Sequence, residues 1–432
     1  MALRLPRSLL NHLSLSVMLP AIRFSYGFAL AALLSKYLPV EQYGRWSLFI
    51  SNAYLVLTFA SVNLMYAASV ILTGKTFPEQ KRDIFSLIVA KYGLTAIVFV
   101  AFAGYLVHSH TFDLQIVALL GLVLVAMTAN NTVFGLLRAL LRVKRQVLFF
   151  GVECGSVIVC VLTATWLLGG GIRDAIVAFL VAQALAAVVG VFLLRQYLGW
   201  GEFDWKVIRR YLAVGLPLIP FAFSDLIVNS LVPLLIKVYD SFESVAVYSI
   251  AQKVALLATV PNAIINNVYA QYLKRSRLES GLPGVRKTFF TFLAVYLGLT
   301  APVMIGLALF GRHIILLVST EHYVSSYGLM LMLAAANVII MITAMLTTVF
   351  AVYERTRAIG FIWLGVLAVY LVLNQLLVPV YKLDGIAYAL LATFALGLIA
   401  VLIAAVKMYV QKRRTDALLN PRPSSDVYHS IK

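Results

Sequence analysis

Stretches of about twenty apolar residues recur along this chain and limit its fold more than any other feature. A helix needs about 20 apolar residues to cross the hydrocarbon core of a bilayer. Twelve such stretches, separated by short polar loops, fall at residues 14–36, 45–72, 85–107, 114–137, 147–169, 173–195, 211–237, 244–271, 288–311, 325–352, 358–380 and 384–408. With 62% hydrophobic and 12% charged residues, the chain is too apolar for a soluble domain. The spacing predicts an all-α polytopic membrane protein with 12 transmembrane helices.

Basic residues gather on alternate loops between these stretches. The chain has 35 Lys and Arg against 17 Asp and Glu. The basic residues include Arg4 and Arg7 before the first stretch, Lys75, Lys81, Arg82 and Lys91 after the second, and Arg138, Arg142, Lys144 and Arg145 after the fourth. Loops on the cytoplasmic side of a membrane carry such an excess. The pattern predicts that the N- and C-termini are cytoplasmic. Because the basic residues alternate with the predicted membrane spans, we expect no nucleic-acid partner.

The longest polar connection between stretches falls near the middle of the chain. It divides the sequence into an N-terminal lobe of six helices at 1–195, a cytoplasmic connection at 196–210, a C-terminal lobe of six helices at 211–410, and a tail at 411–432 that we expect to be disordered. The two halves resemble each other: VEQYGRWSLF at 40–49 compares with FESVAVYSIA at 242–251, and GIRDAIVAFL at 171–180 with KLDGIAYALL at 382–391. We therefore expect two pseudo-symmetric lobes around a central cavity.

Motifs of soluble catalysis are missing from the sequence. It has no GxxxxGK[ST] phosphate loop, its six histidines are scattered, and its two cysteines, Cys154 and Cys160, fall in one apolar stretch. No serine or cysteine is paired with a base. We therefore expect neither an enzyme nor a cofactor or metal site.

Four ionisable residues interrupt the apolar stretches: Arg23, Glu153, Asp225 and Lys253. A charge at the centre of a bilayer costs roughly 2.5 to 3.5 kcal/mol on insertion scales, so such residues face a polar cavity or a partner. Asp225 and Lys253 are placed to form a structural salt bridge, and this alternative stays open. Glu153 lies near a helix end, where it can also reach the cytoplasm or pair with Arg142 or Lys144.

Neutral polar residues accompany these charges on helical projections. Asn52, Asn63 and Tyr66 share one face of the second stretch, and Asn267 and Gln271 lie on the face of Lys253. Such stripes indicate a cationic, water-filled cavity that suits an anionic substrate. The candidate substrate-binding residues are Arg23, Lys253, Asn52, Asn63, Tyr66, Asn267 and Gln271, and the candidate ion-coupling residues are Asp225 and Glu153.

Several motifs together resemble a known family. They are the Leu-Pro pair at 19–20 in the first stretch, LPVEQYGRWSLF at 38–49, GLPLIPFAFSD at 215–225, VAVYSIAQKVA at 245–255 and LVPVYKLDGIAYAL at 377–390. In this order and spacing the chain is similar, over essentially its whole length, to the bacterial polysaccharide exporters of the multidrug, oligosaccharidyl-lipid and polysaccharide exporter superfamily. The branch that it most resembles is that of the Wzx-type flippases.

The resemblance implies a function. Flippases of this kind move oligosaccharide repeat units of O-antigen or exopolysaccharide, carried on undecaprenyl pyrophosphate, across the bacterial inner membrane during lipopolysaccharide and other polysaccharide biosynthesis. They alternate between inward-open and outward-open states. The resemblance also implies membrane lipids, H+ or Na+, and the polysaccharide polymerase machinery as partners. By position, Arg23 and Lys253 match cations that bind the cargo, and Asp225 matches a coupling residue. Lipid II flippases of the superfamily carry two further helices, which favours the oligosaccharide branch.

Other functions leave different sequence patterns. A drug/cation antiporter of the same fold would have a mainly acidic cavity. A membrane-embedded glycan polymerase or glycosyltransferase would show a large outer loop or clustered acidic residues, whereas Asp113, Asp174 and Asp240 stand singly. A subunit that does not transport would not need the polar stripes.

Overall fold

A computed structural model gives the fold of residues 7–72, 75–109, 111–199, 201–216, 219, 226–353 and 356–419. The side chains at 7–17, 20, 263, 266, 267, 356–358 and 412–419 are outside this description. All regular secondary structure in the described ranges is helical. The first helices are α1 (Arg7–Tyr37), α2 (Val40–Ser61), α3 (Leu64–Ile71), α4 (Phe77–His108), α5 (Leu114–Ala139), α6 (Val143–Leu162) and α7 (Ile172–Leu194). They are followed by α8 (Trp205–Gly215), α10 (Val232–Tyr239), α11 (Phe242–Ala255), α12 (Val260–Val318), α13 (Tyr327–Val352) and α14 (Thr356–Leu419).

Several of these helices are long and apolar enough to cross a membrane. In the described ranges there are eight, or nine when α2 and α3, bent by 45°, count as one span. α12 and α14 each join two helices across a break, at Gly281 with φ 59° and at Lys382 with φ 49°. The breaks match the polar loops predicted between neighbouring spans. The all-helical multi-span fold is confirmed, and the count of twelve spans stays a prediction.

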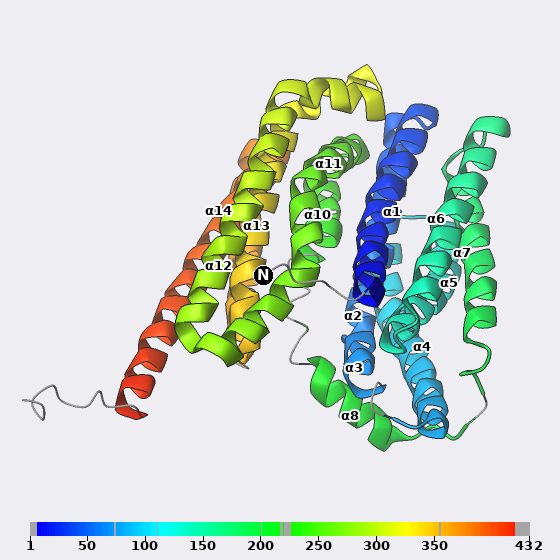
Figure 1. Ribbon diagram of the computed structural model, residues 1–432. Helices are drawn as coiled ribbons and strands as arrows, with labels where there is room; N and C mark the ends of the chain where they lie inside the picture. Colours follow the sequence, from blue (N-terminus) through cyan, green and yellow to red (C-terminus); the bar gives the residue numbers. More distant parts are fainter. Residues whose placement is uncertain are drawn as a thin grey trace, which may run out of the picture.

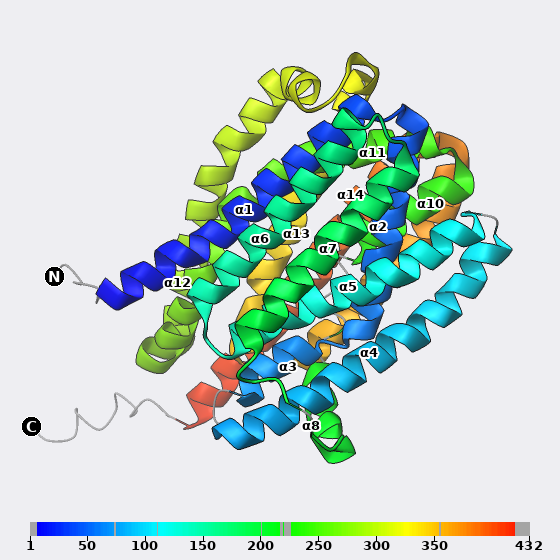
Figure 2. The same ribbon diagram turned by 90° about the vertical axis from the view of Figure 1, so that its right-hand side faces the viewer.

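The helices form two lobes that meet along α2 and α11 (Figure 1). In Figure 1 α1 to α7 lie on the right, α12 to α14 lie on the left, and α10 and α11 lie between them. α1 also packs against α12. A view from the side shows α6 and α7 next to each other on the surface of the first lobe (Figure 2). The helix that follows the first turn of each lobe, α2 or α11, therefore forms the contact between the lobes.

The ends of the molecule differ in how their apolar side chains cluster. One shared core takes Leu34 and Phe49 from the first lobe together with Val245 and Tyr323 from the second. Two smaller cores each belong to one lobe. The first-lobe core includes Leu64, Phe149 and Tyr211, and the second-lobe core includes Tyr269, Tyr296 and Met345. We call the end at the α1–α2 turn the joined end and the end at the α3–α4 turn the split end.

Close backbone packing holds the joined end. A Cβ atom added at Gly44 of α2 would lie 1.8 Å from the carbonyl oxygen of Phe242 in α11, so only glycine allows this approach. The Ser35 hydroxyl donates to the carbonyl oxygen of Val318 at 3.1 Å, and the Lys36 ammonium donates to that of Leu317 at 2.8 Å. Both bonds tie the end of α1 to the end of α12.

Tyrosine 43 adds an aromatic contact at the same end. Its ring packs edge-on against Tyr323, with centroids 6.1 Å apart. Edge-to-face pairs of this kind add about 0.5 to 1.5 kcal/mol beyond the area they bury. The joined end thus combines backbone contact, hydrogen bonds and aromatic packing between lobes.

A buried carboxylate organises the split end of the first lobe. Asp83 is fully buried, pairs with Lys75, and accepts a 2.8 Å hydrogen bond from the Tyr211 hydroxyl of α8. α8 also packs against α3, where a Cβ at Gly215 would lie 2.5 Å from the carbonyl oxygen of Val62. Residues 211–215, which begin the predicted seventh span, therefore contact the first lobe. That span resumes as a π-helical turn at Ile227–Leu231 and as α10.

Candidate functional site

A cavity of about 180 Å³ lies against one face of α2. Tyr54, Leu57, Thr58 and Ser61 line it at the i, i+3, i+4 and i+7 spacing of one helix face. The remaining lining residues are Asn63, Asn131 and Ile219. Five of the seven carry a hydroxyl or amide group, so the cavity offers hydrogen-bonding groups within an apolar bundle.

A helix break shapes this cavity. Val62 and Asn63 both adopt left-handed backbone conformations, with φ of 43° and 52°, and α2 and α3 meet there at 45°. Left-handed geometry is costly for a β-branched residue such as valine. Non-helical backbone at membrane depth is tolerated where it lines a cavity. The break places Asn63 on the cavity wall, and it persists because α8 packs against it.

A buried lysine stands behind the cavity wall. Lys91 of α4 is 1% exposed, and its ammonium donates to the side-chain oxygen of Asn131 at 2.7 Å. In the described part of the chain no carboxylate lies within salt-bridge distance of it. A buried ammonium without an anion is costly. Since Asn131 is itself exposed to the cavity, Lys91 lies one hydrogen bond behind the cavity wall.

Two successive asparagines on α5 connect this lysine to a second polar group. Asn131 binds Lys91, and the Asn130 amide donates to the side-chain oxygen of Gln183 at 2.6 Å and to its carbonyl oxygen at 2.9 Å. Gln183 is in turn a neighbour of the Glu153 carboxylate on α6. A polar network therefore runs through the first lobe from α4 across α5 and α7 to α6.

Arg23 joins this network to the second lobe. It is an exposed residue of α1 and interacts electrostatically with Glu153, with Lys253 of α11, and with Tyr54 of the cavity wall. Glu153 therefore has Arg23 as an electrostatic partner, whereas Arg142 donates to the Tyr197 hydroxyl at 3.3 Å. Arg23 and Lys253, predicted from different lobes, are electrostatic neighbours in the structure.

The structure places the other predicted residues as follows. Asn52 is 1% exposed, and neither of its side-chain polar atoms has a partner in the described residues. Tyr66 is 51% exposed and Gln271 is also exposed. Asp225 lies outside the described residues, as does the side chain of Asn267.

The expected single stripe of Asn52, Asn63 and Tyr66 does not form. A projection at 100° per residue assumes one continuous helix, and the break at Val62 and Asn63 ends it. Only Asn63 of the three lines the cavity.

Several residues of this site were not predicted from the sequence, among them Lys91, Tyr54 and Asn131. Lys91 was grouped with loop cations, although it lies within the apolar run SLIVAKYGLTAIVF at 86–99. The apolar residues on both sides of it were the available signal. Tyr54 and Asn131 carry no such signal, because tyrosine and asparagine also occur on lipid-facing or packed helix faces.

The arrangement is suited to binding an anion that carries further polar groups. Arg23, Lys253 and Lys91 are the basic side chains of this region, and Glu153 is its acidic side chain. Asn63, Asn131, Thr58 and Ser61 supply neutral donors and acceptors. In the ranges that the structure describes, no group of three or more His, Cys, Asp or Glu side chains is arranged to hold a metal ion.

Solved transporter structures share this fold. An inward-facing multidrug resistance MATE family transporter has a TM-score of 0.70 and 15% identity over 90% of this chain and 95% of its own. The lipid II flippase MurJ in an inward closed conformation has a TM-score of 0.70 and 13% identity over 93% and 89%. An outward-facing MATE transporter has a TM-score of 0.59 and 15% identity over 93% and 94%. At such low identity the likeness shows the fold alone: this chain has the multi-span helical fold of these proteins.

Sequence comparison then gives the family. The profile of the polysaccharide biosynthesis protein family matches residues 29–328. This chain belongs to that family, which agrees with the resemblance drawn from its motifs. No curated protein matches it.

Proposed function

We propose that this protein is a flippase that moves oligosaccharides linked to undecaprenyl pyrophosphate from the cytoplasmic to the periplasmic leaflet of the bacterial inner membrane. The cargo would be a repeat unit of O-antigen or exopolysaccharide. Pyrophosphate and sugar cannot cross hydrocarbon unaided. A path between two lobes lets the headgroup stay in water while the prenyl chain stays in lipid.

One observation carries the proposal. Arg23 of the first lobe and Lys253 of the second interact electrostatically, and Arg23 also interacts with Tyr54 of the cavity wall. Two cations from opposite lobes repel each other unless an anion lies between them. A pyrophosphate bound there would draw the lobes together, which couples cargo binding to the change of state.

The arrangement of the joined and split ends supports the proposed movement of cargo from the cytoplasmic side. The shared core and the contacts of Gly44, Ser35 and Lys36 close the joined end, whereas the cores at the split end are separate. With cytoplasmic termini, as the loop charges predict, the split end faces the cytoplasm, where such a cargo is loaded. The higher TM-score for the inward-facing MATE transporter than for the outward-facing one agrees with this orientation.

Glu153 supplies a means of ion coupling in this proposal. Its carboxylate offsets the charge of Arg23 in the empty site. When Glu153 binds a proton, Arg23 keeps its full charge for the cargo. Asp225 remains a second coupling candidate. A Glu153→Gln variant should therefore bind cargo but lose the dependence of transport on a proton gradient.

Transport in reconstituted vesicles tests the proposal. A fluorescent lipid-linked oligosaccharide would be followed from leaflet to leaflet with wild type, Arg23→Ala, Arg23→Lys and Lys253→Ala at matched amounts of folded protein. We expect both alanine variants to lose transport and Arg23→Lys to recover part of it. Arg173→Ala is the matched control, because Arg173 is an exposed arginine that pairs with Asp113 at 3.8 Å.

Two results would contradict the proposal. Full transport by both alanine variants would make these cations structural. Efflux of organic cations by wild type, without movement of the lipid-linked oligosaccharide, would instead identify a drug/cation antiporter of the same fold.

A further inference from the structure

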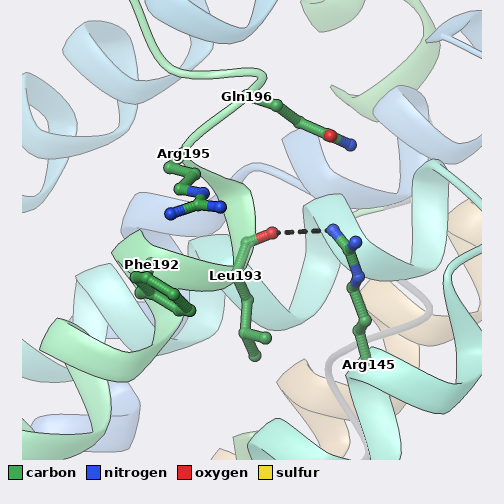
Figure 3. Close-up of a pocket in the computed structure, with 5 residues that line it drawn as sticks. All are labelled: Arg145, Phe192, Leu193, Arg195 and Gln196. Carbon is green, nitrogen blue, oxygen red and sulfur yellow. Dashed lines mark hydrogen bonds between the residues drawn. The ribbon is translucent and has the colours of Figure 1, made fainter.

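A second cavity lies on the first lobe, outside the path between the lobes. Its volume is about 160 Å³, and Arg145 of α6 lines it together with Phe192, Leu193, Arg195 and Gln196 at the end of α7. Figure 3 shows the side chains of Arg145, Arg195 and Gln196 around this hollow. No acidic residue lines it, so its lining carries two positive charges.

Both arginines are held in place by neighbours. The Arg145 guanidinium donates to the carbonyl oxygen of Leu193 at 3.1 Å (Figure 3). The Arg195 guanidinium lies 4.6 Å from the centre of the Phe192 ring. Neither contact is with a carboxylate, and in the described residues neither arginine forms a salt bridge. Each guanidinium has five N–H donors, so donors remain for an anion that enters the cavity.

An exposed apolar surface leads from the bundle to this cavity. On α7, Val181, Leu185, Val188 and Phe192 are 47%, 52%, 69% and 62% exposed and lie on one helix face by their spacing. On the neighbouring α6, Leu148 is 57% exposed and follows Arg145 by one turn. In a membrane protein such a surface contacts acyl chains. The two arginines therefore stand where the acyl-chain surface ends, at the level of lipid headgroups.

We infer that the cavity between Arg145 and Arg195 binds the phosphate headgroup of an anionic phospholipid, whose acyl chains lie along α6 and α7. Arginine binds phosphate through paired N–H groups, and basic pockets between membrane helices bind anionic headgroups. The cavity is about five times the ~30 Å³ that a water molecule occupies in the liquid, which is enough for a phosphate group. The site is separate from Arg23 and Lys253 and does not depend on the proposed transport function.

Native mass spectrometry of the full chain tests this inference. Protein would be purified in detergent and incubated with phosphatidylglycerol, which is anionic, or with phosphatidylethanolamine, which is zwitterionic. We expect wild type to retain phosphatidylglycerol in preference, and Arg145→Gln/Arg195→Gln to bind it about tenfold more weakly. Lys206→Gln/Arg209→Gln removes the same charge from exposed positions of α8 and should bind as wild type does.

Each other outcome would overturn the inference. Equal retention by wild type and the Arg145→Gln/Arg195→Gln variant would show that the cavity is not the site, and an equal loss in the control would show a general effect of charge. Inorganic phosphate that raises the unfolding temperature of wild type, without any preference for phosphatidylglycerol, would show that the ligand is free phosphate. Arg195→Gln alone, at an exposed position, provides a variant that keeps the Arg145 contact and the fold.

Discussion

The joined and split ends of this molecule use opposite kinds of packing. At the joined end, α2 and α11 approach so closely that Gly44 touches the backbone of Phe242, and one apolar core crosses from lobe to lobe. At the split end each lobe completes its own core, and the first lobe fixes α8 through the buried carboxylate of Asp83. The comparison teaches that contacts between the lobes gather at the joined end, while each lobe has a core of its own at the split end.

The largest effect on transport is expected for a substitution at Gly44. In Gly44→Val the side chain would overlap the Phe242 carbonyl, and overpacking costs about 1 to 3 kcal/mol or more. The joined end would then stay apart, and transport should fall about tenfold or further. Gly93→Val is the matched control, because nothing lies within 4 Å of a Cβ at Gly93. Equal transport by both variants would mean that the joined end does not need to close.

Variants of Asp83 test whether α8 belongs to the first lobe. Asp83→Ala leaves Lys75 without its carboxylate, and loss of one partner of a buried pair costs about 3 to 5 kcal/mol. We expect a lower unfolding temperature and faster proteolysis of the connection at 196–204. Lys75→Met/Asp83→Leu replaces both partners with apolar groups and should be less destabilised than Asp83→Ala. If the double variant unfolds as early as the single one, the pair is not what holds α8.

A substitution at Lys91 is expected to affect stability and transport in different ways. Lys91→Met removes a buried charge that has no acidic partner in the described residues, so the unfolding temperature should stay or rise. If Lys91 acts on the cargo through Asn131, transport at low cargo concentration should still fall about tenfold. Both quantities would be measured on the same preparation. A variant that is more stable and fully active would limit the site to Arg23 and Lys253.

The smallest effect is expected on closure of the joined end when the hydrogen bonds between α1 and α12 are removed. Ser35→Ala and Lys36→Met each remove one bond to the end of α12, and a bond of this kind contributes about 0.5 to 1.5 kcal/mol. Each variant should shift the population toward a separated joined end by a few-fold. The reaction rate of a cysteine placed at Val318, which is 5% exposed, with a polar thiol reagent measures that shift. An unchanged rate in both variants would show that these bonds do not contribute to closure.

Much of the fold could be predicted from the sequence, because helix length and apolar content follow directly from the thickness of the bilayer. Most predicted stretches match helices, and the predicted loops match the breaks at Gly281 and Lys382. The second stretch, at 45–72, and the seventh, at 211–237, are each divided between helices. The break at Val62 and Asn63 could not be predicted, since neither residue favours a left-handed conformation strongly enough. It depends on the packing of α8, which is a long-range contact.

The candidate site was predictable only where a charge interrupts an apolar stretch. Arg23, Glu153 and Lys253 were found in this way. Asp83 was not, because it directly follows Lys81 and Arg82 and looks like part of a solvated loop. Lys91 was not, because it was grouped with these loop cations although apolar residues flank it. Their burial results from tertiary packing, which periodicity does not reveal.

Distances between spin labels at the two ends test the central claim most directly. In a background of Cys154→Ala and Cys160→Ala, one pair would be placed at Tyr37 and Leu317 on the joined end and the other at Arg209 and Leu278 on the split end, all at exposed positions. The protein would be held in lipid nanodiscs with and without a lipid-linked oligosaccharide. Reciprocal changes are predicted, with the joined pair lengthening as the split pair shortens. If both pairs keep one distance under every condition, or change in the same direction, the alternating-access account is wrong.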